Sequence, residues 1–279
     1  MFLIKDLHSL IFTLSAGRSS LVIHMEVVSS WTTIPWLEAN FVFVARDPET
    51  KLAKAVPPLE CVTEEEKVTF ARIEATQQQQ KRTRQERQKD CLNVFGLDMP
   101  SEECSAAAAS LLQVSTPLLA LPTLTDPSAA FISSTKMSNT VICHHQYRNI
   151  HGRIFGGFLM RQAYELAFLN AYTFLGSQPV FREVDQIVFR RPVEIGDIFR
   201  FDSCVILTVE KDEKRPHPLI HLEVVASIVK PEHQSVTISN VFHFTFESRV
   251  LGVVKRVLPT TIEEAIRMAN VMEMNKNQE

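Results

Sequence analysis

One stretch of the chain could activate a carbonyl group: RNIHGRIFGGFLMRQAYELAFLNAYTFLG, from Arg148 to Gly176. A polar turn and two adjacent glycines, Gly156 and Gly157, precede a run that is apolar on nearly all sides. The first N–H groups of a helix have no intrahelical partner, and the helix dipole is positive there. Glycine has no Cβ, so a substrate carbonyl could approach such donors closely. We therefore predict a helix from about Phe155 to Phe174 that begins with an oxyanion donor.

A helix that is apolar nearly all round is normally buried on most sides, so other elements must surround this one. Alternating and β-branched residues, separated by Pro, Gly and charged turns, predict the strands that do so. The expected strands are residues 139–147, 180–193, 197–210, 219–229 and 236–248. The pattern predicts an α+β fold in which one curved antiparallel sheet wraps around a long central helix.

The chain also contains an internal repeat. IHMEVVSS at 23–30 reads almost letter for letter as IHLEVVAS at 220–227, and ANFVFVA at 39–45 parallels SNVFHFTF at 239–246. Each copy then reaches a proline and a capping-box helix start, Thr63 with Glu66 or Thr261 with Glu264. The first copy shows only three strands, at 10–14, 21–30 and 37–47, and no equivalent of the glycine-led helix. We expect it to be a truncated unit whose apolar sheet face packs against the second copy or against another chain.

These patterns divide the chain into four parts. Residues 1–62 form the partial unit, and 133–250 the complete one, followed by a C-terminal helical tail at 251–279. Between the units, residues 63–132 should hold a charged, solvated helix from Glu64 to Lys89. They should also hold a linker, partly disordered, from Leu97 to Pro127, because that stretch has no clear period.

Composition excludes several function classes. With 29 basic and 32 acidic side chains, and no aromatics among the bases of 77–90, nothing indicates a nucleic-acid partner. The apolar N-terminal run is too short to span a bilayer and lacks the features of a signal or transit peptide. Five cysteines without a CxxC pair favour a reducing compartment. The adjacent His144 and His145 would face opposite ways in a strand, so we expect no metal site.

The residues Asn149, Gly152, Gly156 and Gly157 resemble the NxxGxxxGG pattern of hotdog-fold acyl-coenzyme A thioesterases. The run RNIHGRIFGGFLMRQAYELAF, followed by EVDQIVFRRPVEIGD and NVFHFTF, is similar in particular to the type 9 group of that family. Members of that group carry two hotdog domains in one chain and are mitochondrial. The resemblance covers about residues 133–250 strongly and 10–70 as a fragment.

The resemblance implies hydrolysis of a fatty acyl-coenzyme A thioester to free acid and coenzyme A, without a cofactor. Two hotdog units would pair edge to edge, so a homo-oligomer is expected. It implies a mitochondrial location, although the visible N-terminus carries no transit signal; a cytoplasmic location is the alternative. The alternative function is a catalytically impaired module that binds acyl-coenzyme A or dimerises. A hotdog dehydratase would need a His on the central helix, which has none.

By the resemblance, the asparagine of the family's motif corresponds to Asn149, and the backbone N–H at Gly157 would be the oxyanion donor. The family's common helix Asp falls on Tyr164, with Glu165 beside it. One residue turns a helix by about a hundred degrees, so Glu165 could point elsewhere. Asn149 could instead serve as a turn or capping residue. Glu165 could simply be neutralised by Arg161 one turn earlier.

Two further sites follow from the resemblance. Asp185 matches an acidic position in the family's second strand, although an inward Asp beside Arg182 is as easily structural. Arg18 and Ser19 resemble a strand-connecting stretch that contacts the phosphates of the coenzyme. The alternative for GRSS is a plain hairpin turn with Gly17 at positive φ.

Overall fold

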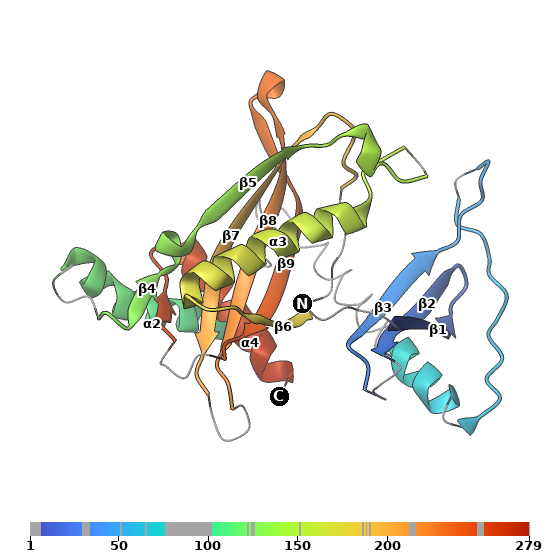
Figure 1. Ribbon diagram of the computed structural model, residues 1–279, viewed down its shortest axis with the longest axis horizontal. Helices are drawn as coiled ribbons and strands as arrows, with labels where there is room; N and C mark the ends of the chain where they lie inside the picture. The colour runs from blue at the N-terminus through green and yellow to red at the C-terminus, as the bar shows by residue number, and fades with distance from the viewer. Residues whose placement is uncertain are drawn as a thin grey trace. The chain divides into compact units, whose positions relative to one another are not determined.

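A computed structural model describes residues 7–29, 34–50, 52–64, 66–75, 102–121, 123, 126–150, 152–185, 187, 189, 191–211, 216–249 and 254–278. The chain forms two compact units, residues 1–91 and 92–279 (Figure 1). Each unit is built around its own antiparallel sheet.

The first unit holds a sheet in the order β1-β2-β3, with strands β1(Leu7–Ala16), β2(Ser20–Ser29) and β3(Leu37–Val44). All three strands expected from the sequence are confirmed. Residues 66–75 are helical, and Glu66 and Thr63 make the predicted capping box through bonds of 3.0 and 3.2 Å. The predicted continuation of this helix, 76–89, lies outside the described residues.

The register of this sheet gathers apolar side chains on one face. Residues opposite each other in adjacent strands share a face, and the pairs include Ile23 with Phe41 and Leu21 with Phe43. Phe41 and Phe43 are 42% and 52% exposed, so this face is open to solvent. Val22 is the buried apolar side chain of the described part of this sheet. The first unit therefore has little core of its own.

The second unit carries the five-stranded sheet that the sequence predicts, in the order β5-β7-β8-β9-β6 and antiparallel throughout. Its strands are β5(Met137–Ile142), β6(Val180–Val184), β7(Ile198–Val209), β8(Leu219–Lys230) and β9(Ser235–Glu247). The first two are shorter than expected. After β5 the chain turns into the short helix η3(His145–Tyr147), and β6 ends before Asp185. The repeated IHxEVV sequences lie in β2 and β8, and each of these strands pairs with neighbours on both sides.

Helix α3(Gly156–Leu175) crosses one face of this sheet, as predicted (Figure 1). Its inner side packs on the aromatic row of β9, where Phe242, Phe244 and Phe246 are almost fully buried. Gly176 ends the helix in the left-handed conformation, with φ 66°. The expectation that this helix is buried on most sides is only partly met, because Leu169 and Tyr172 are 54% and 46% exposed. The sheet covers one side of the helix and leaves the other open.

Helix α2(Glu102–Ala120) corrects the sequence-based expectation of a partly disordered linker between Leu97 and Pro127. It packs along α4(Ile262–Gln278), where Cys104 and Ala108 contact Ala265 and Ala269. The Cys104 thiol donates a hydrogen bond to Asn270 Oδ1 at 3.0 Å. Small side chains at positions 104, 108 and 115 make the buried stripe. Such residues produce only a weak hydrophobic periodicity, and the sequence pattern therefore does not predict this helix.

Helix α4, the predicted C-terminal helix, packs against the sheet face opposite α3. Arg267 of α4 forms an ion pair with Glu223 of β8, and both side chains are largely buried. Lys136 pairs with the buried Glu264 at 2.8 Å.

The smaller elements of this unit are β4(Ala129–Phe131), η2(Ile132–Thr135), η4(Pro231–His233) and β10(Arg256–Leu258), with β4 and β10 forming a parallel pair. Among the helices that the structure describes, none is both long and apolar enough to cross a membrane.

Candidate active site

The start of α3 presents free backbone donors. The helix begins at Gly156, after the extended N-cap residue Phe155, which makes no side-chain capping bond. Phe158 N–H already bonds back to Phe155 O at 3.0 Å. Within the described residues, the N–H groups of Gly156 and Gly157 have no acceptor. Gly157 is exposed, so its N–H and the positive end of the helix dipole are available to a ligand oxygen.

Two aromatic rings occupy the space that the glycines leave open. A Cβ at position 156 would stand 2.8 Å from Phe189 Cζ, and a Cβ at position 157 would stand 2.9 Å from Phe155 Cζ. Both distances are too short for a real contact. The sequence predicts that an approaching carbonyl uses this space, whereas in the structure the two rings occupy it. The glycines thus allow Phe155 and Phe189 to lie against the first turn of the helix.

Asn149 holds the loop that leads into α3. Its backbone N–H donates to Arg153 O at 2.6 Å, and its side-chain Oδ1 accepts the Arg153 N–H at 3.1 Å. Gly152 takes a positive φ of 79° in the same turn, and Arg148 forms an antiparallel bridge with Ile154. The turn role proposed as the alternative for Asn149 is therefore confirmed. Its catalytic role stays a prediction.

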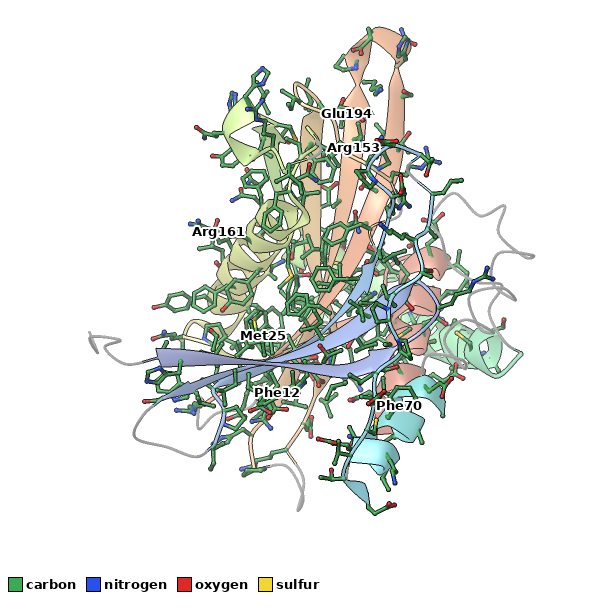
Figure 2. The ribbon with its side chains drawn as sticks, turned by 90° about the vertical axis from the view of Figure 1, so that its right-hand side faces the viewer. Phe12, Met25, Phe70, Arg153, Arg161 and Glu194 are labelled. Atoms are coloured by element: carbon green, nitrogen blue, oxygen red, sulfur yellow. The ribbon has the colours of Figure 1, made fainter. Side chains whose placement is uncertain are left out.

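This loop and the helix start lie at the same end of α3. Phe155 N–H donates to Tyr147 O at 2.8 Å, which ties the helix start to the segment just before Asn149. A small surface pocket is lined by Arg148, Asn149, Ile150 and Gly152. Arg153 leans toward Glu194, with 3.5 Å between Nε and Oε1 (Figure 2). The structure thus brings Asn149 and Gly157 into one region.

Glu165 lies elsewhere on the helix. Its Oε1 accepts a bond from Arg161 Nε at 2.8 Å, and its Oε2 accepts one from Gln162 Nε2 at 3.1 Å. The alternative interpretation, in which Arg161 neutralises Glu165, is confirmed. At 1.5 Å of rise per residue, Glu165 stands about 12 Å along the axis from Gly157. The two cannot act on the same carbonyl within one copy of this unit.

Tyr164, at the position where the family's common Asp falls, points into the core. Its ring meets Phe181 and Phe244 edge-on, with centroids 5.5 and 5.9 Å apart. Burial raises the pKa of the Tyr164 hydroxyl above its ordinary value. A neutral phenol packed among phenylalanines does not replace a carboxylate.

Asp185 follows β6 directly, and its backbone N–H donates to His243 O at 3.1 Å. The neighbouring Arg182 forms an ion pair with Glu247, at 3.5 Å between Nε and Oε2. Arg249 also approaches Glu247, at 3.8 Å. The catalytic role of Asp185 stays a prediction.

Arg18 and Ser19 belong to the first unit, in the turn between β1 and β2. Their carbonyls accept the N–H groups of Val56 and Ala45 at 3.1 and 2.8 Å. The Arg18 side chain is exposed. The hairpin turn is confirmed, but Gly17 does not take the positive φ suggested for it. A Cβ there would approach Ser20 Oγ to 2.9 Å, a contact that rotation of the serine side chain could relieve. Phosphate binding at Arg18 and Ser19 stays a prediction.

Two core cysteines do not supply a nucleophile. Burial raises the pKa of Cys143 to about 11 and that of Cys204 to about 12, so both remain neutral thiols near pH 7.

Over the ranges that the structure describes, no three His, Cys, Asp or Glu side chains gather closely enough to hold a metal ion. The chemistry available at the start of α3 is thus polarisation of a ligand oxygen by backbone N–H groups.

Phe155 and Phe189 belong to this region, although no residue pattern used above indicates them. Phe155 could have been noticed, because it directly precedes the two glycines. Phe189 lies more than thirty residues further along the chain, and no local pattern connects it with the helix start. Only the fold brings them together.

No family model matches the chain. Acyl-coenzyme A thioesterase 2, chloroplastic, of Humulus lupulus is 39% identical over 92% of this chain and 60% of its own length. Acyl-coenzyme A thioesterase 9, mitochondrial, of Homo sapiens is 34% identical over 90% of this chain and 54% of its own length. A solved acyl-CoA hydrolase from Bacillus cereus shares 20% identity, covering 54% of this chain and 89% of its own, with a TM-score of 0.46.

The chain spans about half to three fifths of the length of the curated relatives that it matches. Each match includes residues of both units, because the uncovered tenth of the chain is shorter than either unit. The chain is therefore a homologue of the acyl-coenzyme A thioesterases over about nine tenths of its length.

Proposed function

We propose that this chain takes part in the hydrolysis of fatty acyl-coenzyme A thioesters to free fatty acid and coenzyme A. The observation that carries the proposal is a pair of glycine N–H groups at the start of α3 that have no acceptor among the described residues, in a chain homologous to acyl-coenzyme A thioesterases. The wrapped sheet and its crossing helix fit the hotdog arrangement expected from the sequence. Residues 1–91 would then be a partial unit of the same kind.

The chemistry requires few groups. The thioester carbonyl oxygen would accept the Gly157 N–H, where the helix dipole favours the negative charge that develops as water attacks. The water oxygen bonds to the carbonyl carbon, the C–S bond breaks, and the departing sulfur receives the proton released by the water. Because a thiolate leaves readily, oxyanion stabilisation with a placed general base can suffice.

The general base would come from a second unit. Glu165 is the acidic residue of α3 and lies too far from Gly157 of its own copy to assist there. We infer that two copies pair through exposed sheet edges, so that Glu165 of one reaches the Asn149–Gly157 region of the other. Asp185 is the other candidate carboxylate, and Arg18 with Ser19 would hold the phosphates of the coenzyme.

The test is release of free thiol from acyl-coenzyme A substrates of several chain lengths. Gly157→Pro removes the N–H donor at a first-turn position where proline is tolerated. Gly157→Ala, which places a Cβ against Phe155 in the same way but keeps the N–H, is its matched control and should retain most of the rate. Loss of one oxyanion donor lowers kcat by about 10²- to 10³-fold. Leu169→Ala, on the exposed side of α3 far from Gly157, is the control and should keep the rate. Equal rates in wild type and Gly157→Pro, with helicity preserved by circular dichroism, would refute the oxyanion role.

A second function is favoured by the side chains of α3. Tyr164 is packed inward and Glu165 is paired with Arg161, so the helix offers no unengaged carboxylate. The chain would then bind acyl-coenzyme A or dimerise without hydrolysing the thioester. Ligand binding by a wild-type chain whose thiol release does not exceed buffer would establish this module.

We also infer an organellar location, because the relatives named above are called chloroplastic and mitochondrial. Fractionation of the native protein with organelle markers tests this inference. Recovery in the cytosolic fraction alone would refute it and favour the cytoplasmic alternative.

A further inference from the structure

Phe155 and Phe189 are two exposed aromatic side chains at the start of α3. Phe155 is 59% exposed and Phe189 is 48% exposed, although both rings lie directly over the glycines. Phe155 comes from the loop before the helix, and Phe189 from the segment after β6. Neither belongs to the core cluster of this unit. The two rings are apolar surface that the fold does not bury.

The sequence makes specific room for both rings. Any side chain at position 156 would displace Phe189, and any at 157 would displace Phe155. Two neighbouring positions thus each accommodate one ring, from segments more than thirty residues apart. A ligand oxygen bound to the Gly157 N–H lies about 3 Å from that nitrogen. Because the rings lie against the Cβ positions of residues 156 and 157, the atoms attached to this oxygen can contact them.

We propose that Phe155 and Phe189 form an apolar clamp that contacts the acyl chain adjacent to the thioester carbonyl and favours longer acyl groups. The inference rests on the proposed function and adds to it the specificity-determining side chains. An acyl chain suits this position better than the pantetheine arm of the coenzyme, because pantetheine carries amides. Those amides need hydrogen-bond partners, and two phenylalanine rings offer none. A saturated chain loses nothing by contact with them and gains from leaving water.

Binding of non-hydrolysable thioethers tests the clamp independently of turnover. Calorimetry would compare S-hexyl-coenzyme A with S-ethyl-coenzyme A in wild type, Phe155→Ala, Phe189→Ala and Leu169→Ala. Burial of part of the four additional methylenes should make the hexyl compound bind about tenfold tighter to wild type. Each phenylalanine variant should cut that ratio at least threefold, whereas Leu169→Ala, which removes an equally exposed apolar side chain, should keep it.

The outcomes separate this inference from the proposed function. Binding of both thioethers, with the hexyl preference expected above but without hydrolysis of the matching thioesters, would refute the proposed function and still support the clamp. Hydrolysis with an unchanged hexyl-to-ethyl ratio in both phenylalanine variants would overturn the clamp and leave the function standing. Equal binding of the hexyl and ethyl compounds by wild type would also overturn the clamp. Circular dichroism checks that each variant is folded, which is expected because both rings are half exposed.

Discussion

At the residue scale, Asn149 combines a structural contact that is visible with a catalytic role that is proposed, and two substitutions can separate them. Asn149→Ala removes the Oδ1 acceptor of the Arg153 N–H, whereas Asn149→Asp retains an acceptor there. Loss of such a hydrogen bond costs about 1 kcal/mol, so hydrogen exchange at Arg153 should accelerate about fivefold in the Ala variant only. If the Asp variant keeps that protection but loses thiol release, the amide group does more than hold the loop. Full activity in both variants would contradict the catalytic assignment.

Glu165 and Arg161 form an exposed pair on one helix face, with side chains 45% and 73% exposed. Exposed pairs of this spacing contribute about 0.3–0.5 kcal/mol, so neither Glu165→Gln nor Arg161→Ala should move the urea midpoint appreciably. Thiol release should fall in Glu165→Gln and persist in Arg161→Ala if the carboxylate acts across a pair of copies. Equal effects of the two variants on rate would assign the pair a purely structural role.

At the scale of elements, α4 is fixed to the sheet by a charge pair at a buried position. The Glu223 side chain is 4% exposed and Arg267 18% exposed. Removing one partner leaves the other buried without compensation, so Arg267→Met should destabilise the second unit by about 3–5 kcal/mol. The double variant Glu223→Leu/Arg267→Met should recover most of that loss. Urea unfolding followed by far-UV circular dichroism measures both, and a double variant no better than the single one would contradict this account.

Glu264 gives the attachment of α4 a pH dependence. Burial acts to raise the pKa of its carboxyl, but Lys136 and the hydrogen bonds from Thr260 outweigh burial and hold the pKa below 4.5. A depressed carboxyl pKa contributes stability that is fully present above the unfolded value and is lost as the pH falls through the folded value. The free energy of unfolding should therefore decline below about pH 4.5 more steeply in wild type than in Glu264→Gln. Parallel curves for the two proteins would exclude this contribution.

The elements show which parts of the structure can be predicted from sequence. The hydrophobic periodicity of the sequence predicts α3 and the longest strands correctly, because apolar residues such as Val, Ile and Phe alternate in the strands and recur on one face of the helix. The sequence does not predict helix α2, because its buried residues Cys104 and Ala108 are small and differ little in hydrophobicity from the exposed residues around them. At the site, the glycine-led start of α3 was predictable from local chemistry. The contact of Phe189 with Gly156 was not, since it depends on where the chain goes after β6.

At the scale of the whole molecule, the two units differ sharply in how much core each has. Both hydrophobic clusters among the described residues, twenty-six and four buried side chains, lie in residues 92–279. The first unit relies on a three-stranded sheet, in the described part of which Val22 is the buried apolar side chain. Sheets of this size are marginal without a partner. We therefore expect the chain to unfold in two steps, with the first unit unfolding first.

The chain contains natural probes for this behaviour, because both of its tryptophans, Trp31 and Trp36, belong to the first unit. Tryptophan fluorescence should report a transition at lower urea than far-UV circular dichroism, which the second unit dominates. Val22→Ala should shift the fluorescence transition alone. Phe244→Ala, by opening a cavity under α3, should destabilise the second unit by about 3–5 kcal/mol and shift the dichroism transition. Coincident transitions in wild type, moving together in both variants, would mean instead that the two units fold as one cooperative body.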